Sequence, residues 1–218
     1  MIKRKNILKI SIDSPAAAGA GTQAKLISKH YKLLWLDTGK CYRYVANIKI
    51  TEPKKFNYVY IKKKIKKLKI KDLQNKNLLS DKVATIASII AKDKKIRKIV
   101  KNFQLECAYN PPKKYLGSCL DGRDIGSVIV KDADIKLYIT ATLKVRAMRR
   151  FKELKAKNKK ISFENVLKSI KNRDKNDKNR KISPLKKTKD MYLINSSSES
   201  ISSCFMKIKK IIDRKLYL

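Results

Sequence analysis

The sequence has few residues of the kinds that bind metals or form disulfides. It contains one histidine, His30, and four cysteines among 218 residues. Cys41, Cys107, Cys119 and Cys204 are far apart and show no C-x-x-C spacing, so the pattern indicates neither a zinc site nor a disulfide framework. We therefore expect reduced, structural thiols.

Long hydrophobic runs are also absent. No apolar stretch approaches the roughly 18 to 20 residues that a membrane-spanning helix needs. The basic segment 1–6 leads directly into a strand-like stretch rather than into the apolar region of a signal peptide. The length is typical of one domain. We expect a single-domain, soluble protein of the cytoplasm with no membrane partner.

Acidic residues are scarce relative to basic ones. The chain has 18 Asp and Glu against 56 Lys and Arg, a formal net charge of +38. Clustered positive charge would point to nucleic acid. Here the basic residues are spread along the whole chain, and Ile and Asn are also heavily used, as an AT-rich genome would produce. We favour a solvated basic surface with no specific nucleic-acid partner, and keep a basic RNA-associated protein as an alternative.

Short apolar runs alternate with helical stretches along most of the chain. Buried strands are expected at 7–13, 33–36, 115–120, 135–139 and 191–195. Helices are expected at 22–30, 82–109, 143–157, 163–172 and from 199 onward. The lysine-rich segment 51–81 has no clear period. The alternation predicts an α/β fold, a five-stranded parallel sheet covered by helices on both faces.

A small-residue turn joins the first strand to the first helix. Such a turn can wrap a phosphate, because its backbone amides and those of the helix start point at the anion. Compared with G-x-x-x-x-G-K-[ST], Gly19 fits the second glycine, Ser14 replaces the first, and Ala20 replaces the lysine. Gly21 precedes Thr22, whose hydroxyl is placed to reach a magnesium ion. By pattern alone the motif is incomplete, and the stretch taken by itself fits a tight turn of small residues as well as a phosphate loop that lacks its cation.

Four collinear motifs extend this interpretation to nearly the whole chain. They are I-D-S-P-A-A-A-G-A-G-T (12–22), L-D-T-G-K-C-Y-R (36–43), L-D-G-R-D-I-G (120–126) and R-D-K-N-D-K-N-R (173–180). In order and spacing the chain resembles the bacterial cytidylate kinase family, and D-G-R-D-I-G is the most specific of the motifs. The resemblance implies a P-loop nucleoside monophosphate kinase fold.

The resemblance also implies an activity and an organisation. The reaction would be transfer of the γ-phosphoryl group from ATP to CMP or dCMP, with Mg²⁺ as cofactor. An insertion at about 40–110 would bind the acceptor nucleotide, and a lid at about 150–182 would close over it. We expect a monomer whose partners are these small nucleotides.

Site residues follow from the resemblance by position. The loop that binds ATP phosphates would comprise Ser14, Pro15, Ala16, Ala17, Ala18, Gly19, Ala20, Gly21 and Thr22, with Thr22 also at the metal. The acceptor nucleotide would be bound by Thr38, Arg43, Ser88, Arg97, Asp121, Arg123 and Asp124. The catalytic residues of the lid would be Arg173, Asp177 and Arg180.

These residue types suit phosphoryl transfer, which depends on positioning and on stabilising charge at the phosphoryl oxygens. Arginine grips two phosphate oxygens with a planar fork and stays ionised. Asp121 and Asp124 end a buried strand, so each carboxylate needs a partner. The amino group of cytosine is one such partner. The carbonyl of uracil at that position is not, which favours CMP over UMP.

The loop departs from the family at three positions, of which Ala20 matters most. Without the lysine, a catalytically weakened nucleotide-binding protein of the same fold is a second alternative. If catalysis persists, another cation must replace the lysine. The candidates by chain position are Lys40, Lys25, Arg149 and Arg150, and we expect an arginine of the lid. Trp35 is interpreted as a packing residue.

Overall fold

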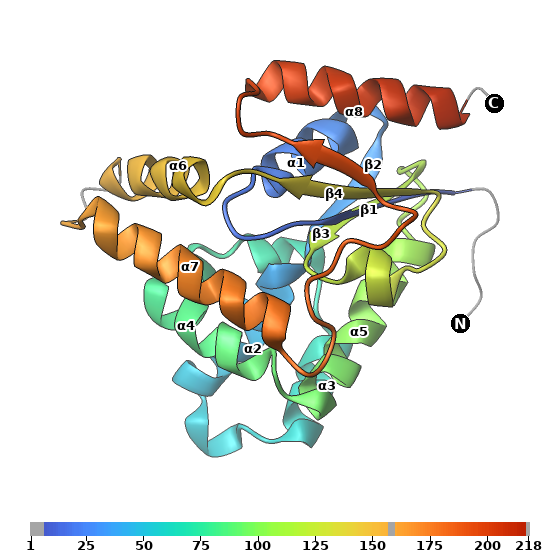
Figure 1. Ribbon diagram of the computed structural model, residues 1–218. Helices are drawn as coiled ribbons and strands as arrows, with labels where there is room; N and C mark the ends of the chain where they lie inside the picture. Colours follow the sequence, from blue (N-terminus) through green and yellow to red (C-terminus); the bar gives the residue numbers. More distant parts are fainter. Residues whose placement is uncertain (1–6, 157–159, 217–218) are drawn as a thin grey trace.

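The protein is described by a computed structural model that covers residues 7–156 and 160–216. Within these residues one five-stranded sheet has the order β2-β3-β1-β4-β5, and every neighbouring pair is parallel (Figure 1). The strands are β1 (Leu8–Asp13), β2 (Leu33–Asp37), β3 (Gly117–Gly122), β4 (Ile135–Thr140) and β5 (Tyr192–Asn195). The expected α/β fold and its five parallel strands are confirmed.

Helices cover both faces of this sheet. On one face α1 (Ala20–His30) and α8 (Ile201–Leu216) pack on the strands, in a core that includes Ile12, Leu137 and Ile208. The other face is covered by α2 (Thr38–Thr51), α3 (Tyr58–Lys66), α4 (Asp81–Ile90) and α5 (Lys94–Tyr109). A parallel sheet needs this double cover because both of its faces are apolar.

The helices α2 to α5 form the block between β2 and β3. They are joined by short 3₁₀ turns at Pro53–Lys55, Ile70–Gln74 and Lys76–Leu79. The segment 51–81, which has no clear period, is therefore α3 with these turns around it. Leu73 and Leu78 from the turns are buried in the same core as Leu36 and Leu120 of the sheet. The block packs as part of the main body.

The expected single helix at 82–109 is wrong. The structure breaks it into α4 and α5 at Asp93, whose Oδ1 accepts hydrogen bonds from the backbone N–H groups of Lys95 (2.8 Å) and Ile96 (3.0 Å). Aspartate at an N-cap starts a new helix because it satisfies amides that have no intrahelical partner. The apolar periodicity of the sequence continues on both sides of Asp93, so the pattern alone does not reveal the break.

Two helices project from the carboxyl ends of the strands, α6 (Leu143–Lys155) and α7 (Phe163–Asn179) (Figure 1). They share a small core of Ala147, Leu154, Val166 and Ile170, and Ala17 of the loop after β1 packs against it. The helix expected at 163–172 is longer, so Arg173 and the residues after it up to Asn179 continue α7.

Candidate functional site

The loop between β1 and α1 has the backbone of an anion site. Ala17 (φ 60°) and Gly19 (φ 90°) adopt left-handed conformations, which turn successive amides toward one side. The carbonyls of Ala16 and Ala18 accept hydrogen bonds from Arg146 Nη1 and Ser196 Oγ, each at 3.0 Å. Helix α1 begins at Ala20 with no side-chain cap, so its first amides remain available to a ligand.

The end of β3 lies against this loop. Asp121 is 9% exposed, and a Cβ placed on Gly21 would lie 3.7 Å from its Oδ2. Trp35 donates its indole N–H to Asp121 Oδ1 at 2.7 Å. Burial, and then the negative charge of Asp37 on the neighbouring strand, raise the pKa of Asp121 to about 7. The carboxyl is therefore poised to change its charge near neutral pH.

Thr38 fastens the start of α2 to this strand end. Its hydroxyl donates to the Asp121 carbonyl at 2.8 Å. A Cβ on Gly122 would come within 2.5 Å of that hydroxyl oxygen, so only glycine allows the approach. Helix α2 begins at Thr38, directly after β2 ends at Asp37, with no loop between the two elements.

Asp124 joins three parts of the chain. It is buried, it forms an ion pair with Arg97 of α5, and Arg180 Nη2 lies 3.4 Å from its Oδ1. Arg97 also donates to the Ala91 carbonyl at 3.1 Å. Three residues predicted from separate parts of the chain are thus brought together between the α2–α5 block and the end of α7.

An arginine cluster lies at the same end of the sheet. Arg123 Nε donates to Asp177 of α7 at 2.8 Å. Arg173 is exposed, and the charge of Arg123, followed by partial desolvation, lowers its pKa to about 10, with Arg43 and Arg150 acting in the same direction. Like charges that lower one another's pKa cost free energy, and an anion bound among them would remove that cost.

Ser88 is the predicted residue that the structure does not bring to the others. It is exposed on α4, and its hydroxyl donates to the Thr85 carbonyl of its own helix at 2.7 Å. Arg43, by contrast, reaches across to the Leu78 carbonyl at 2.8 Å. Because α4 and α5 are separate helices, Ser88 and Arg97 do not share the one long helix expected from the sequence.

Sequence reasoning missed several residues that organise this site. Trp35 was expected only to pack, but its indole N–H holds Asp121. Arg146 holds the loop and pairs with Asp174 of α7, its Nη1 lying 3.0 Å from Asp174 Oδ1. In the basic helix α6, nothing in the sequence distinguishes Arg146 from its exposed neighbours.

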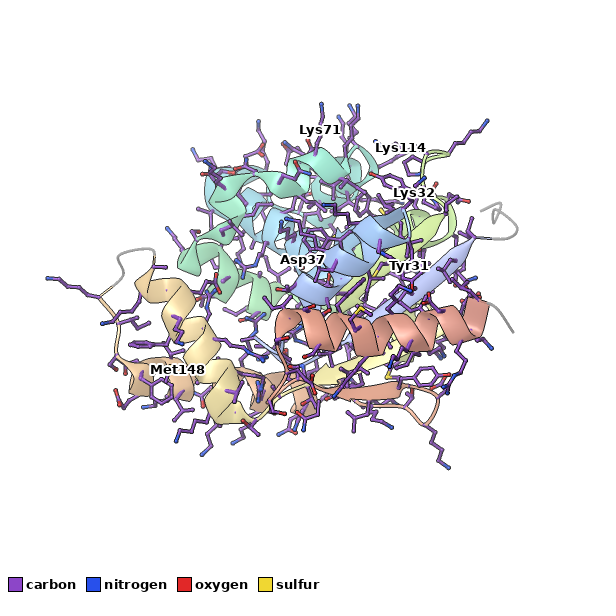
Figure 2. All side chains as sticks on the ribbon, turned by 90° about the horizontal axis from the view of Figure 1, so that it is seen from above. Tyr31, Lys32, Asp37, Lys71, Lys114 and Met148 are labelled. Atoms are coloured by element: carbon purple, nitrogen blue, oxygen red, sulfur yellow. The ribbon has the colours of Figure 1, made fainter. Side chains whose placement is uncertain are left out.

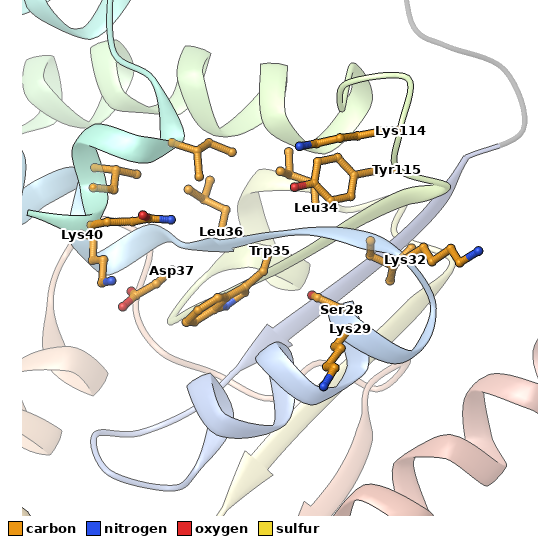
Figure 3. A pocket seen from close by; sticks show the side chains of 14 residues that line it. Ser28, Lys29, Lys32, Leu34, Trp35, Leu36, Asp37, Lys40, Lys114 and Tyr115 are labelled. Atoms are coloured by element: carbon orange, nitrogen blue, oxygen red, sulfur yellow. The ribbon is translucent and has the colours of Figure 1, made fainter.

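Two cavities flank the site. One of about 400 Å³ lies between the α4–α5 connection and the end of α7, and is lined by Lys92, Asn176, Asn179, Arg180, Lys181 and Ile182. The other, of about 490 Å³, follows the edge strand β2 and shares Trp35, Asp37 and Lys40 with the region around Asp121 (Figure 3). A small ligand at the end of β3 would lie between them.

The positive charge is not gathered at one place on the surface. Figure 2 shows long side chains that end in nitrogen around the whole outline of the molecule, including Lys32, Lys71 and Lys114. This spread does not favour the RNA-associated alternative, which needs a basic patch.

Over residues 7–156 and 160–216, no helix combines the length and the apolar character that crossing a membrane requires.

Comparisons with known proteins agree on one family. A family model described as cytidylate kinase matches residues 10–214. The chain is 37% identical to a cytidylate kinase of Mesorhizobium japonicum over 209 residues, which is 95% of each chain. It is 38% identical to that of Bartonella henselae, covering 94% of each chain, and 37% identical to one of Clostridium botulinum, covering 95% of this chain and 98% of the relative.

One solved structure is similar in fold. It is an uncharacterized protein from Eubacterium ventriosum, with a TM-score of 0.55, 15% sequence identity, and coverage of 94% of this chain and 98% of that one. At this identity the likeness supports the fold alone.

Proposed function

The chain belongs to the cytidylate kinase family, and we propose that the site at the carboxyl ends of β1 to β3 transfers the γ-phosphoryl group of ATP to CMP or dCMP. Membership makes the protein a nucleoside monophosphate kinase, a phosphotransferase. The observation that carries the site assignment is the arginine cluster around Arg173, which lies at the same end of the sheet as an uncapped, phosphate-type loop.

Phosphoryl transfer at this place needs donor and acceptor in line. An oxygen of the acceptor phosphate forms a bond to the γ-phosphorus, and the bond to the oxygen that leaves with ADP breaks. The loop amides and the start of α1 would hold the donor phosphates. Arg173, Arg123 and Arg43 would neutralise the phosphoryl oxygens, whose charge is greatest as the group moves.

The acceptor base would be read between α5, the end of β3 and the end of α7. Asp124 and its partners Arg97 and Arg180 border the 400 Å³ cavity at Arg180. We infer that a carboxylate here, at Asp121 or Asp124, accepts from the cytosine amino group. Uracil would place a carbonyl against an acceptor-only group, so it would be rejected.

Segment 40–110 shares a core with the sheet and would stay with it, whereas segment 150–182 would move relative to the sheet. We infer that the first is the acceptor-binding insertion and the second a lid, because ion pairs from both meet at Asp124, and Arg123 pairs with Asp177. These polar links are compatible with opening. The α6–α7 pair has a small core of its own, which lets it move as a unit.

Magnesium fits this site as an ion that arrives with ATP. The described residues contain no group of three or more His, Cys, Asp or Glu side chains that would hold a metal without a substrate. Mg²⁺ keeps several waters and takes few protein oxygens beside substrate phosphates. Thr22, exposed on the first turn of α1, offers such an oxygen. When bound, the ion would supply positive charge that neutralises the donor phosphates.

All of these groups come from one chain, and we infer a monomer that works in the cytoplasm. The test of the function is steady-state turnover of CMP, dCMP, UMP and AMP with ATP and Mg²⁺, together with binding of each nucleotide. We expect the two cytosine nucleotides to be phosphorylated far better than the others. Equal use of UMP would refute the base-reading assignment.

The weakened-kinase alternative is favoured by one observation, the absence of a cation at Ala20. It predicts that CMP and ATP bind but that no ADP is released. The RNA-associated alternative predicts instead tight, steeply salt-dependent RNA binding without nucleotide turnover.

A further inference from the structure

The phosphate loop lacks a positively charged side chain of its own. Ala20, at the start of α1, ends in a methyl group that is 5% exposed. Donor phosphates bound there would meet backbone amides, but amides carry only partial charges. Catalysis at this loop therefore needs a cation from elsewhere in the chain, and the structure separates the candidates.

Arg149 and Arg150 are engaged elsewhere. Arg149 donates to Ser196 Oγ (3.0 Å) and to the Ser196 carbonyl (2.6 Å), and Ser196 in turn bonds the Ala18 carbonyl. Arg149 borders the loop, since its Nη1 lies 3.8 Å from a Cβ placed on Gly19, but its guanidinium is bonded to Ser196. Arg150 bonds Glu153 at 2.8 Å and acts on Arg173, so it belongs to the arginine cluster.

Lys25 points to solvent. It is exposed on α1, among buried neighbours at Ala24 and Ile27 that face the sheet. Arg149 and Arg150 are thus bonded to other groups and Lys25 is exposed, which leaves Lys40 among the four candidates.

Lys40 lies in the first turn of α2, just after the carboxyl end of β2. It comes three residues after Asp37, which pairs with Asp121 across the β2–β3 register. Its Nζ is 5.9 Å from the centroid of the Trp35 ring, and Figure 3 shows Lys40 and Asp37 beside that ring. The edge of the same indole bonds Asp121.

Asp121 connects this lysine to the loop. Its carboxylate borders Gly21, the residue after Ala20, at 3.7 Å from a Cβ placed there. The charges of Arg123 and Lys40 both lower the pKa of Asp121, against the larger effect of burial and of Asp37. No carboxylate in the described part of the chain lies within ion-pair distance of Lys40. Its ammonium group is held by weak, adjustable contacts.

We propose that Lys40 supplies the ammonium group that the phosphate loop lacks at Ala20. This assignment rests on the proposed kinase function and names a catalytic residue within it. When ATP is bound, the ammonium would leave the Trp35 face for the β- and γ-phosphate oxygens. It would then follow the negative charge as the β–γ bridging oxygen leaves with ADP.

The test is a double-mutant cycle on the full chain. Four proteins are compared for kcat and KM with CMP and ATP: the natural protein, Lys40→Met, Ala20→Lys, and the double variant. Methionine keeps the packing on Trp35 while removing the charge. We expect Lys40→Met to lower kcat on the order of ten- to a hundredfold, the effect of one charge-assisted contact. Ala20→Lys alone should change kcat little, and the double variant should recover to within a few fold of the natural protein.

The matched control is Lys49→Met. Lys49 lies on the same helix α2, is exposed, and its Nζ is 5.4 Å from the Phe56 ring, so it repeats the lysine-on-aromatic contact away from the loop. Equal kcat values for Lys40→Met and Lys49→Met would overturn the proposal. So would a double variant no better than Lys40→Met, provided that circular dichroism shows it folded. If it is not folded, the contrast between the two methionine variants decides alone.

A second measurement separates this proposal from the function itself. Binding of a non-hydrolysable ATP analogue with Mg²⁺ is measured by calorimetry for the same proteins. If the natural protein turns over no CMP, the proposed function is refuted. The assignment of Lys40 still predicts that Lys40→Met binds the ATP analogue at least threefold more weakly, and that adding Ala20→Lys restores this binding. Binding unchanged across the set, with no turnover, would refute both.

Discussion

The phosphate loop and the arginine–carboxylate site beside it depart from the family pattern to different degrees. The loop has lost glycines and its lysine, yet it keeps left-handed residues at Ala17 and Gly19 and an uncapped helix start. In the neighbouring site, the resemblance shows no such departure among the charged residues that it assigns, which include Asp124 and Arg173. A site made of backbone amides tolerates side-chain changes, whereas one made of charged side chains does not.

The largest effect is expected at the side-chain site. Arg173→Ala should lower kcat about 10³-fold or more and leave the KM for ATP nearly unchanged, because an arginine on the transferring group acts mainly in the transition state. Steady-state kinetics with CMP measures this. Lys171→Ala, exposed on the same helix, is the control. A change confined to KM would show that Arg173 only binds substrate.

The second effect is on stability. Arg97→Ala would leave the buried Asp124 with Arg180 as its remaining charged partner, at 3.4 Å. Breaking a buried ion pair costs about 3 kcal/mol because a charge is left uncompensated. Urea unfolding should show this loss, while Lys98→Ala, the exposed neighbour on α5, should unfold like the natural protein. Equal urea midpoints for Arg97→Ala and Lys98→Ala would mean that the Arg97–Asp124 ion pair does not stabilise the protein.

A third prediction concerns the pH dependence of stability at Asp121, which lies between the phosphate loop and the arginine–carboxylate site. The pKa of Asp121 is about 7 in the folded protein against an ordinary value of 3.8. The folded chain thus holds a proton that the unfolded chain has released, so this residue lowers stability as pH rises from about 4 to 7. Asp121→Asn keeps an oxygen for the Trp35 indole and has no charge to bury.

We therefore expect Asp121→Asn to lose kinase activity and to be roughly 2 kcal/mol more stable than the natural protein at pH 8, with the gain shrinking toward pH 4. Thermal or urea unfolding across this range measures it. Asp13, whose pKa burial also raises to about 7, titrates in both proteins and cancels in the difference. A gain that is constant with pH would show that the carboxyl of Asp121 does not titrate there.

These contrasts also explain what could be predicted from the sequence. The strands were predictable because both faces of a parallel sheet are apolar, whereas the site roles of Asp121 and Arg180 stay predictions that rest on the motifs at 120–126 and 173–180. The break at Asp93 was not, since the apolar period continues across it. Trp35 and Arg146 were missed because their roles come from partners about 86 and 130 residues away, which no local pattern records.

The smallest effects test the loop itself, through a reciprocal pair of substitutions. Gly19→Ala has room, since the added Cβ would lie 3.8 Å from Arg149 Nη1, so its cost is the left-handed backbone alone, about 1 to 2 kcal/mol. Ala17→Gly relieves the same kind of strain. Glycine also raises the conformational entropy of the unfolded chain, and the substitution removes the methyl contact with the α6–α7 core. Each of these two effects lowers stability by under about 1 kcal/mol.

For Ala17→Gly these terms oppose one another, so we expect stability within about 1 kcal/mol of the natural protein and kcat within about threefold, while Gly19→Ala is clearly destabilised. Urea unfolding and turnover of CMP measure both. If Ala17→Gly instead lost most of its activity, the methyl group at Ala17 would be acting through the α6–α7 helices, and the loop would not be a site of backbone alone.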